Sequence, residues 1–272
     1  MNGVLVIDKE KGITSRDVVN KVVKEYNTKK VGHTGTLDPI ATGVLVVCVG
    51  SATKLVSLLT NHDKEYIATV ELGKLTDTLD STGNLIKEEN VNITKEKIID
   101  VLNSFKGKYI QEVPIYSAVK VRGRKLYEYA RSNEYVELPK REVEIYDIEL
   151  LDYKDNNFTF KCSVSKGTYI RALINDIAAK LGTIGIMTDL RRTRLGKFTL
   201  NDCNKGLISI KDVLDIPVIE IDKEIEKKVL NGAKIDNIYN SDKILFVKDN
   251  IEIAIYEKGK PYIMFKGGNI WH

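Results

Sequence analysis

Residues 32–49 read GHTGTLDPIATGVLVVCV, and they place one carboxylate, Asp38, in a glycine-rich turn ahead of an apolar run. Glycines allow backbone angles that other residues resist, and Pro39 pushes Asp38 towards an extended conformation. The run from Val44 to Val49 predicts a buried strand that begins directly after the turn. Reactive residues often lie on loops that a rigid scaffold holds, so we interpret this turn as a candidate catalytic loop. The alternative is an ordinary Asp-Pro turn.

The composition excludes several classes of protein. The chain has 272 residues, of which 43% are hydrophobic, so it can bury a large core and is not expected to be disordered. Its three cysteines and three histidines lack the spacing of a metal site or a disulfide framework, which fits a reducing cytosol. We find no signal peptide and no apolar run near the roughly 20 residues of a membrane helix. We therefore expect a cytoplasmic protein without metal or membrane, and its net charge of +4 permits a polyanionic partner.

Hydrophobic periodicity and capping residues predict a mixture of strands and helices. Strands are expected at Val4–Ile7, Val44–Val49, Tyr66–Leu72, Ser117–Val121, Val143–Tyr153, Phe158–Ser165 and Phe198–Leu200. Helices are expected from Thr14 or Ser15 to Tyr26, at Ala52–Leu59, from Thr94 to Phe105, and at Tyr169–Leu181 before Gly182. These elements follow no strict βαβ rhythm, so they predict an α+β fold around a largely antiparallel sheet flanked by helices.

The composition changes near Asp215, where an acidic stretch begins. Beyond it, three short apolar runs are separated by turn residues and predict three strands at Lys243–Val247, Ile251–Tyr256 and Tyr262–Phe265. We therefore expect a main domain at residues 1–214 and a small all-β module at residues 215–272.

A second candidate group lies at Ser165–Leu173, where a glycine stands between an expected strand and an expected helix. Tyr169 and Arg171 fall in the first helical turn. A guanidinium is always charged and can bind a carboxylate through two parallel hydrogen bonds. If this turn faces the candidate loop, Arg171 pairs with Asp38; the alternative is a surface arginine on an amphipathic helix.

Two segments contain clustered cations. The segment Leu190–Lys197 carries Arg191, Arg192, Arg194 and Lys197 beside Asp189. The segment Ala118–Arg141 carries seven cations and three glutamates with tyrosines interleaved. Cations that neutralise phosphates, together with rings that stack on bases, suit RNA, and we predict RNA contacts by Lys120, Arg191 and Arg192. The alternative is a set of solvated charged surfaces.

Tyr66 opens an expected strand after Lys64-Glu65. It is either a core aromatic or one wall of a pocket that it forms with Tyr169 around a flat ring. Stacking of a base on such a side chain contributes about 1–3 kcal/mol.

The ordered set of motifs resembles the bacterial tRNA pseudouridine-55 synthases of the TruB type. The resemblance covers about Gly3–Leu200 densely and the tail loosely, and the order of the motifs makes it specific. The segments that carry it are Gly32–Gly43, Lys64–Tyr66, Leu72–Asp80, Tyr116–Arg131, Ser165–Arg171 and Leu190–Arg192.

The resemblance implies that a uridine in the TΨC loop of tRNA is flipped out and isomerised to pseudouridine, without a cofactor. Asp38 would be the catalytic carboxylate and Arg171 its partner. The insertion at about residues 107–141 would grip the tRNA, and the C-terminal module would be a PUA-like RNA-binding module. We expect a monomer that binds the T-arm stem-loop. The residues that would line the site of the flipped nucleotide are His33, Tyr66, Tyr169, Leu190 and, nearby, Asp80.

The reaction breaks a C–N glycosidic bond, rotates the base and forms a C–C bond. An anionic oxygen serves the first step either as a nucleophile or by removing a sugar proton, and the sequence leaves both routes open. The last step removes a proton from carbon. Tyr66 is a candidate base only if its pKa falls well below the usual value of about 10, and otherwise it is a packing wall.

The chain departs from the usual family pattern at four positions. Val113 stands where a second proline is common, Val164 where a cysteine is common, Ile184 replaces a glycine, and Ile186 replaces a histidine or an aromatic residue. The change at Ile186 affects one RNA-contact surface. Two other hypotheses stay open: an RNA-binding protein without enzymatic activity, and a related enzyme that acts on another RNA.

Overall fold

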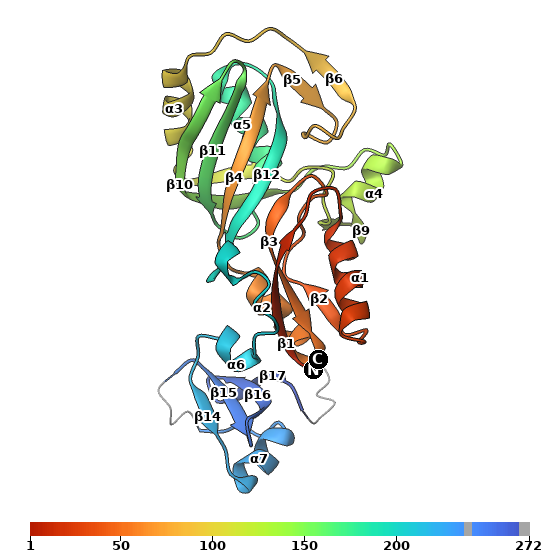
Figure 1. Ribbon diagram of the computed structural model, residues 1–272, viewed down its shortest axis with the longest axis vertical. Helices are drawn as coiled ribbons and strands as arrows, with labels where there is room; N and C mark the ends of the chain where they lie inside the picture. Colours follow the sequence, from red (N-terminus) through yellow and green to blue (C-terminus); the bar gives the residue numbers. More distant parts are fainter. Residues whose placement is uncertain (237–240, 267–272) are drawn as a thin grey trace.

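A nine-stranded sheet runs through the molecule and carries the candidate catalytic loop (Figure 1). The computed structural model describes residues 1–236 and 241–266. The main path of the sheet is β1-β3-β12-β4-β11-β10-β7, with β2 beside β3 and β13 beside β12. Only the β3–β12 pair of this described sheet is parallel, so the prediction of an α+β fold with a largely antiparallel sheet is confirmed. The strands are β1 (Gly3–Lys9), β2 (Val31–His33), β3 (Thr42–Val49), β4 (Lys64–Leu72), β7 (Gly107–Glu112), β10 (Lys140–Lys154), β11 (Asn157–Val164), β12 (Gly185–Leu195) and β13 (Phe198–Thr199).

Helices flank this sheet and begin or end at the predicted signals. Thr14 accepts a hydrogen bond from the backbone N–H of Asp17, whose carboxylate accepts one from the N–H of Thr14, so a capping box begins α1. Gly182, at φ 86°, ends α5 in the left-handed conformation. The helix expected at Ala52–Leu59 is divided into a 3-10 turn and a short α-helix. The elements are α1 (Ser15–Glu25), η1 (Gly50–Leu55), α2 (Val56–Thr60), α3 (Lys95–Asn103) and α5 (Ile170–Leu181).

The main core lies between the sheet and the helices α1, α3 and α5. Alternate residues of β4 point into it, from Tyr66 to Leu72, as their period of two predicts. Helix α5 buries Leu173, Ile174 and Ile177 against this core, and Arg171 lies in the first turn of the same helix. The core therefore fixes the direction in which both Tyr66 and Arg171 present their side chains.

Strand β12 lies at the centre of the sheet, although its sequence did not predict a strand. It pairs with Thr42 and Gly43 of β3 on one side and with β4 on the other. Its cations conceal the alternation that would mark a strand, because one of them, Arg192, is buried. The four cations of Leu190–Lys197 are therefore distributed over a strand and a turn, and they do not form one patch.

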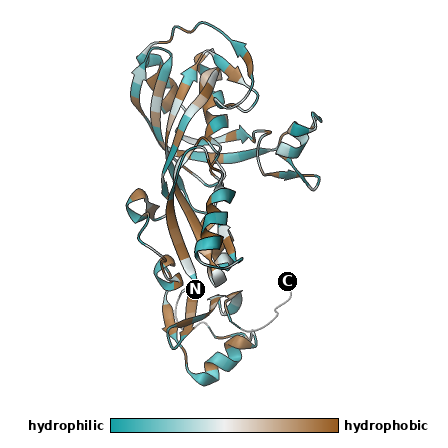
Figure 2. Cartoon of the chain, turned by 45° about the vertical axis from the view of Figure 1, so that its right-hand side comes forward, coloured by the Kyte–Doolittle hydropathy of each residue, from teal (hydrophilic) through white to brown (hydrophobic). Residues whose placement is uncertain are grey.

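The insertion between β7 and β10 projects from the sheet (Figure 2). It holds the hairpin of β8 (Lys120–Val121) and β9 (Arg124–Lys125), followed by α4 (Leu126–Arg131). The strand expected at Ser117–Val121 is wrong for its first three residues, because they form the loop that leads into the hairpin. A second hairpin, of β5 (Lys74–Thr76) and β6 (Leu85–Glu88), follows β4.

The C-terminal region forms a separate four-stranded sheet in the order β14-β15-β16-β17. The three predicted strands are present, but the prediction of an all-β module is wrong, because the acidic stretch forms a further strand and a helix whose N-cap is Asp222. The elements that follow β13 are η2 (Leu200–Asp202), α6 (Ile210–Val213), β14 (Val218–Glu220), α7 (Lys223–Leu230), β15 (Lys243–Lys248), β16 (Ile251–Glu257) and β17 (Lys260–Met264).

The C-terminal sheet shares a hydrophobic cluster with the main domain. Leu245 and Ile255 of this sheet lie in one buried cluster with Val4 of β1 and Val46 of β3. The two parts expected as separate domains thus have a common packed interface. No helix within residues 1–236 and 241–266 has the length and apolarity needed to cross a bilayer.

Candidate active site

The loop that carries Asp38 is fastened to the start of α1. The hydroxyl of Ser15 donates to the carbonyl of Leu37 (3.1 Å) and accepts from the N–H of the same residue (2.9 Å). The N–H of Gly12 donates to the carbonyl of Pro39 (2.8 Å). These bonds hold the backbone on both sides of Asp38, so the carboxylate has a fixed position.

A buried ammonium lies beneath the same loop. Lys9 is 1% exposed, and its Nζ donates to the carbonyls of Ile13 (2.7 Å), Glu10 (2.9 Å) and Pro39 (3.4 Å). Burial lowers the pKa of Lys9, whereas the charge of Asp38 acts to raise it. Lys9 thus connects the end of β1 to the loop and adds positive charge near Asp38.

Arg192 supports the loop from the β12 side. It is 1% exposed; its Nε donates to the carbonyl of Val44 (2.7 Å), and a terminal nitrogen donates to that of Gly35 (3.3 Å). Gly43 lies against the backbone of Arg192, where an added Cβ would come within 2.2 Å of its carbonyl oxygen. This close approach and a φ of 101° explain the glycine at residue 43.

Asp38 and Arg171 are in contact, although they lie 133 positions apart in the chain. The sequence predicted this pair on the condition that the two turns face each other. Arg171 Nε lies 3.0 Å from Asp38 Oδ2, and a terminal nitrogen donates to Oδ1 at 3.3 Å. The Arg171 side chain is 7% exposed, whereas that of Asp38 is 32% exposed. The arginine is therefore embedded, while the acid keeps an open side that a substrate can reach.

Two further loops hold the guanidinium of Arg171. Its terminal nitrogens donate to the carbonyls of Thr78 (2.9 Å) and Tyr116 (3.0 Å). With four contacts to three residues, the guanidinium has little freedom to turn, which is the pre-organised geometry that a lysine cannot reproduce. Nothing in the sequence indicates these two carbonyls, because backbone acceptors leave no signal in the composition.

Asp80 lies beside this pair, and its carboxylate accepts hydrogen bonds from residues of its own loop. Its carboxylate accepts from the hydroxyl of Thr78 (2.8 Å) and the N–H of Thr82 (2.9 Å), and Oδ2 lies 4.0 Å from Arg171 Nε. The loop is fixed to β12, because the N–H of Ser81 donates to the carbonyl of Met187. The buried Asp80 thus faces Arg171 from the side opposite to solvent.

Tyr66 is buried on β4, and the charge of Asp38 acts on it. Burial raises the pKa of Tyr66, the charge of Arg192 opposes part of the shift, and Asp38 adds to it. The condition for a base, a pKa well below 10, is not met in the protein alone. The phenol is protonated at neutral pH, so Tyr66 offers a ring face and a hydroxyl donor.

The other predicted lining residues come from three different elements. Leu190 is buried on β12, at the register of Ala68 in β4. His33 ends β2, and its pKa is lowered by burial and by the charges of Arg16 and Arg192, so the imidazole is neutral at pH 7. Tyr169 precedes α5, and the guanidinium of Arg141 lies 5.6 Å from its ring centroid.

Gln111 is a residue of this region that the sequence analysis missed. It is fully buried on β7; its Oε1 accepts from the N–H of Tyr169 (2.8 Å) and its Nε2 donates to the carbonyl of the same residue (3.2 Å). Nε2 also donates to the hydroxyl of Tyr109 (2.6 Å). Gln111 therefore replaces the side-chain cap that Tyr169 does not supply to α5, two residues before Arg171.

Ser117 is a second missed residue. Within residues 1–236 and 241–266, its Oγ is the one buried side-chain polar atom without a hydrogen-bond partner. It follows Tyr116, whose carbonyl holds Arg171. A buried hydroxyl without a partner is costly, and this one lies next in sequence to a residue that holds Arg171.

Two of the predicted RNA contacts lie outside this centre. Lys120 is exposed on the β8–β9 hairpin. Arg191 forms a bidentate pair with Asp8, at 2.7 and 3.2 Å, on the opposite side of β12 from the buried Arg192. Its guanidinium is thus partly neutralised.

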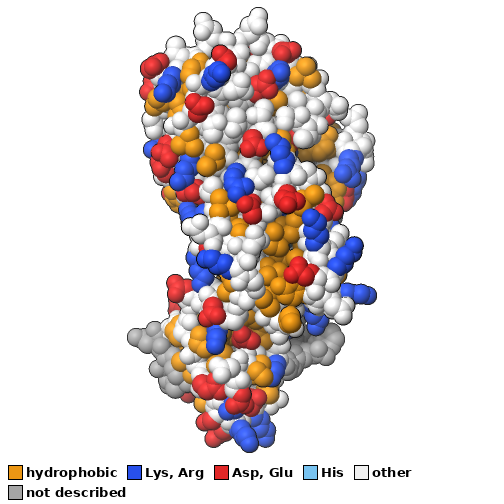
Figure 3. Space-filling view, viewed as in Figure 1, with side chains coloured by type: hydrophobic (Ala, Val, Ile, Leu, Met, Phe, Trp, Pro, Cys, Tyr) orange, Lys and Arg blue, Asp and Glu red, His pale blue; other side chains and the backbone are white. Residues whose placement is uncertain are grey.

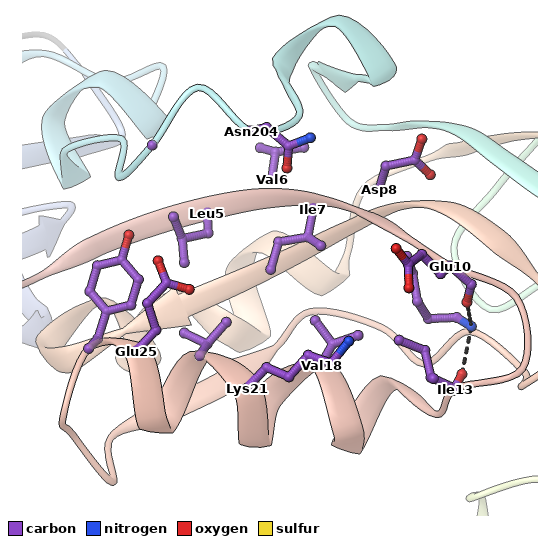
Figure 4. Close-up of a pocket in the computed structure, with 14 residues that line it drawn as sticks. Leu5, Val6, Ile7, Asp8, Glu10, Ile13, Val18, Lys21, Glu25 and Asn204 are labelled. Atoms are coloured by element: carbon purple, nitrogen blue, oxygen red, sulfur yellow. Dashed lines mark hydrogen bonds between the residues drawn. The ribbon is translucent and has the colours of Figure 1, made fainter.

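A groove of about 440 Å³ lies between β1 and α1, and its lining includes Lys9 but not Asp38 (Figure 4). Its floor is apolar, with Leu5, Ile7 and Val18, and Glu25 and Lys21 lie on its α1 side. A second hollow, of about 530 Å³, lies at the far end of β4 beside the β5–β6 hairpin. Neither contains a predicted site residue, and within the described residues no group of three or more His, Cys, Asp or Glu could hold a metal ion.

Two family models match most of the chain. A model of the TruB family pseudouridylate synthase N-terminal domain matches residues 21–170, the segment that holds Asp38, Tyr66 and Asp80. A model of the tRNA pseudouridylate synthase B C-terminal domain matches residues 171–233. The chain belongs to the TruB family of pseudouridylate synthases.

Curated members of the TruB family are similar to this chain over most of its length. A tRNA pseudouridine synthase B of Caldanaerobacter subterraneus subsp. tengcongensis is 44% identical, with 97% of this chain and 99% of the relative covered. One from Staphylococcus aureus strain MSSA476 is 44% identical, with 94% of each covered. One from Fusobacterium nucleatum is 50% identical over 74% of this chain and 70% of the relative.

Solved structures share the fold of this TruB-family chain. The crystal structure of a Cbf5-Nop10-Gar1 complex contains a chain with a TM-score of 0.68 and 27% identity, covering 97% of this chain and 85% of that one. A structure of an H/ACA RNP bound to a substrate RNA containing 2'-deoxyuridine gives a TM-score of 0.66 at 25% identity, covering 99% and 88%. These chains therefore share the fold of this chain over nearly its whole length.

Proposed function

We propose that this protein isomerises a uridine in the T loop of tRNA to pseudouridine, with Asp38 as the catalytic carboxylate. The observation that carries the proposal is the pairing of a partly exposed Asp38 with the embedded Arg171. Both residues fall in motifs through which the chain matches its family. A carboxylate held at a fixed angle, with one side open, is the group that the first step of this isomerisation needs.

The atoms of the reaction balance within the uridine itself. The bond from C1′ to N1 breaks, the freed base turns, and a bond from C1′ to C5 forms. N1 gains a proton and C5 loses one, so no oxidant, reductant or cofactor is consumed. Asp38 acts either by attack on the nucleotide or by removal of a sugar proton, and the contacts of Arg171 serve both routes, because both need a fixed carboxylate.

The residues around Asp38 are suited to binding a flipped base. Tyr66 supplies a ring for stacking, which contributes about 1–3 kcal/mol per base, against a flipping cost of a few kcal/mol. His33, Tyr169 and Leu190 complete the lining, and Asp80 positions Arg171.

The projecting insertion between β7 and β10 is the segment that we propose binds the tRNA. Lys120, Arg122 and Arg131 are exposed there, whereas Arg124 is held by Glu134 at 2.8 Å. The exposed cations can bind phosphates. Arg191 is paired with Asp8, and Arg192 lies beneath the Asp38 loop. Both arginines thus support the shape of the site and are not free surface cations.

The proposed unit is a monomer in the cytoplasm. Asp38, Arg171, Tyr66 and Asp80 come together within one chain, so the site needs no residue of a second copy. Cys48, Cys162 and Cys203 are free thiols, which fits a reducing compartment.

The function is tested with purified protein and an unmodified tRNA transcript. Pseudouridine, mapped by carbodiimide treatment and primer extension, is expected at one T-loop uridine, and a T-arm hairpin alone is expected to suffice. Unrelated stem-loops of equal length serve as controls. Binding without any change to uridine would favour an RNA-binding protein, and modification of an unrelated stem-loop in place of the T arm would favour a related enzyme for another RNA.

A further inference from the structure

Helix α1 starts at the catalytic loop and leads away from it. Ser15, its first residue, is bonded on both sides to Leu37. Arg16 lies close enough to His33 for its charge to lower the pKa of the imidazole. The following residues therefore form a path that begins beside Asp38 and extends about 16 Å along the helix axis.

The outer face of this path has cations without partners. Arg16, Lys24, Lys29 and Lys30 are exposed, and among the residues that the structure describes none of their side chains forms an ion pair or a hydrogen bond. Lys11, just before the helix, is instead paired with Asp189 at 2.8 Å. Between residues 15 and 30 the chain has five cations and only two acids.

Neither Asp17 nor Glu25 forms an ion pair with these exposed cations. Asp17 accepts hydrogen bonds from the N–H and the hydroxyl of Thr14 in the capping box. Glu25 lies on the groove side of the helix, together with Lys21, opposite Asp8 and Glu10 (Figure 4). Lys24 shares its side of the helix with Lys21, three residues before it, and with Asp17, whose carboxylate Thr14 engages, so this side carries an excess of unpaired positive charge.

The basic face lies along the same edge of the molecule as the insertion that we assign to tRNA binding. Figure 1 shows α1 and α4 on this edge, with α1 nearer to the C-terminal sheet. Figure 3 shows Lys and Arg side chains gathered over both elements. One extended polyanion can therefore contact α4, the catalytic loop and α1 together.

We propose that Arg16, Lys24, Lys29 and Lys30 bind the phosphate backbone of the duplex stem that adjoins the flipped uridine. This inference rests on the proposed function, because it places the remainder of the same RNA. Lysines hold phosphates as point charges and read no sequence, which suits a stem whose base pairs differ among tRNAs. Lys24 lies about 12 Å along the helix from Arg16, a span over which a duplex presents several phosphates.

The test is the salt dependence of RNA affinity in a Lys24→Gln/Lys29→Gln double variant. The ligand is a T-arm hairpin with cytidine at the target position, so that no turnover occurs. Loss of two phosphate contacts is expected to lower the slope of log K against log salt by roughly 1.5 and to weaken binding most at low salt.

Lys95→Gln is the matched control, since Lys95 is an exposed lysine at the start of α3, which lies on the opposite edge of the molecule from α1 (Figure 1). Its slope is expected to equal that of the wild type. An unchanged slope in the double variant, or an equal fall in Lys95→Gln, would overturn the proposal. Failure of the proposed function is a separate result, because the wild-type protein would then form no pseudouridine in the unmodified hairpin whatever the slopes.

Discussion

At the scale of single residues, the central feature is the fixed position of the Asp38 carboxylate. Asp38 is held by backbone bonds on both sides of its loop and by a guanidinium with four hydrogen-bonding contacts of its own. Positioning of this kind lets one carboxylate act without reorganisation when the substrate arrives. The pair should therefore be sensitive to small changes in geometry.

Arg171→Lys tests this sensitivity. An ammonium keeps the charge but cannot bond Asp38, Thr78 and Tyr116 together in one plane, so the carboxylate should shift. We expect kcat to fall about a hundredfold while the Kd for the T-arm hairpin changes less than threefold.

The matched control for this change is Arg194→Lys. Arg194 is a half-buried arginine that bonds Ser163 and Gly196 and does not contact Asp38. It should keep kcat within twofold. Equal losses of kcat and affinity in Arg171→Lys would contradict the positioning role.

The protonation of Tyr66 gives a prediction about pH. Its folded-state pKa is raised by burial, so the phenol is protonated from pH 6.5 to 9. The pH profile of kcat/KM reports groups of the free enzyme. The profiles of the wild type and of Tyr66→Phe should therefore have the same shape over this range, whatever their absolute rates. A titration with an apparent pKa below 9 that is present in the wild type and absent from the variant would restore Tyr66 as a base in the free protein.

At the scale of elements, the site depends on how strands and helices are joined. Helix α5 presents Arg171, but its first turn is held by Gln111 from β7. In Gln111→Leu the volume is kept, while the N–H of Tyr169 loses its partner and the hydroxyl of Tyr109 loses one of its two side-chain contacts. We expect the free energy of unfolding to fall by about 2 kcal/mol and kcat to fall about tenfold at unchanged hairpin affinity.

The measurements for Gln111 are urea unfolding and single-turnover rates at saturating RNA. The neighbouring Glu112→Gln, an exposed position on the same strand, should leave both near the wild type. If Gln111→Leu lost stability but kept full kcat, Gln111 would be a structural residue only and would not position Arg171.

The elements also show what sequence can and cannot predict. Strands β3, β4 and β11 follow from alternation or from an apolar run, and the start of α1 follows from the Thr14 cap, because in each case the local pattern and the packing agree. Strand β12 was missed, because it buries Arg192 under a loop 150 positions away in sequence, and a buried cation resembles a surface one in the sequence.

The residues of the candidate site also fall into those that the sequence indicates and those that it does not. Asp38 could be selected from the glycines and the proline around it, whereas its contact with Arg171 depended on two turns meeting and became an expectation only through the resemblance. The carbonyls of Thr78 and Tyr116, the amide of Gln111 and the hydroxyl of Ser117 carried no signal, since their roles depend on three-dimensional neighbours alone.

At the scale of the whole molecule, the C-terminal sheet is packed onto the main domain. Leu245 is fully buried in a cluster that includes Val4 and Val46, whereas Ile253 is buried in a cluster confined to the C-terminal region. Leu245→Ala should lower stability by about 3 kcal/mol and reduce hydrogen-exchange protection in β1 and β3 as well as in β15.

Ile253→Ala is the control for this coupling, because its lost contacts lie among β15, β16 and α7. Its loss of protection should stay in the C-terminal sheet. If Leu245→Ala also left β1 and β3 unchanged, the two parts would be independent domains, as the sequence first suggested.

The whole account depends on one group, and the most direct test is Asp38→Asn under single-turnover conditions with excess enzyme and an unmodified T-arm hairpin. The substitution keeps the size of the side chain and removes its charge. We predict hairpin binding within threefold of the wild type and pseudouridine formation at least about a thousandfold slower. Turnover within tenfold of the wild type would show that the carboxylate of Asp38 is not the catalytic group.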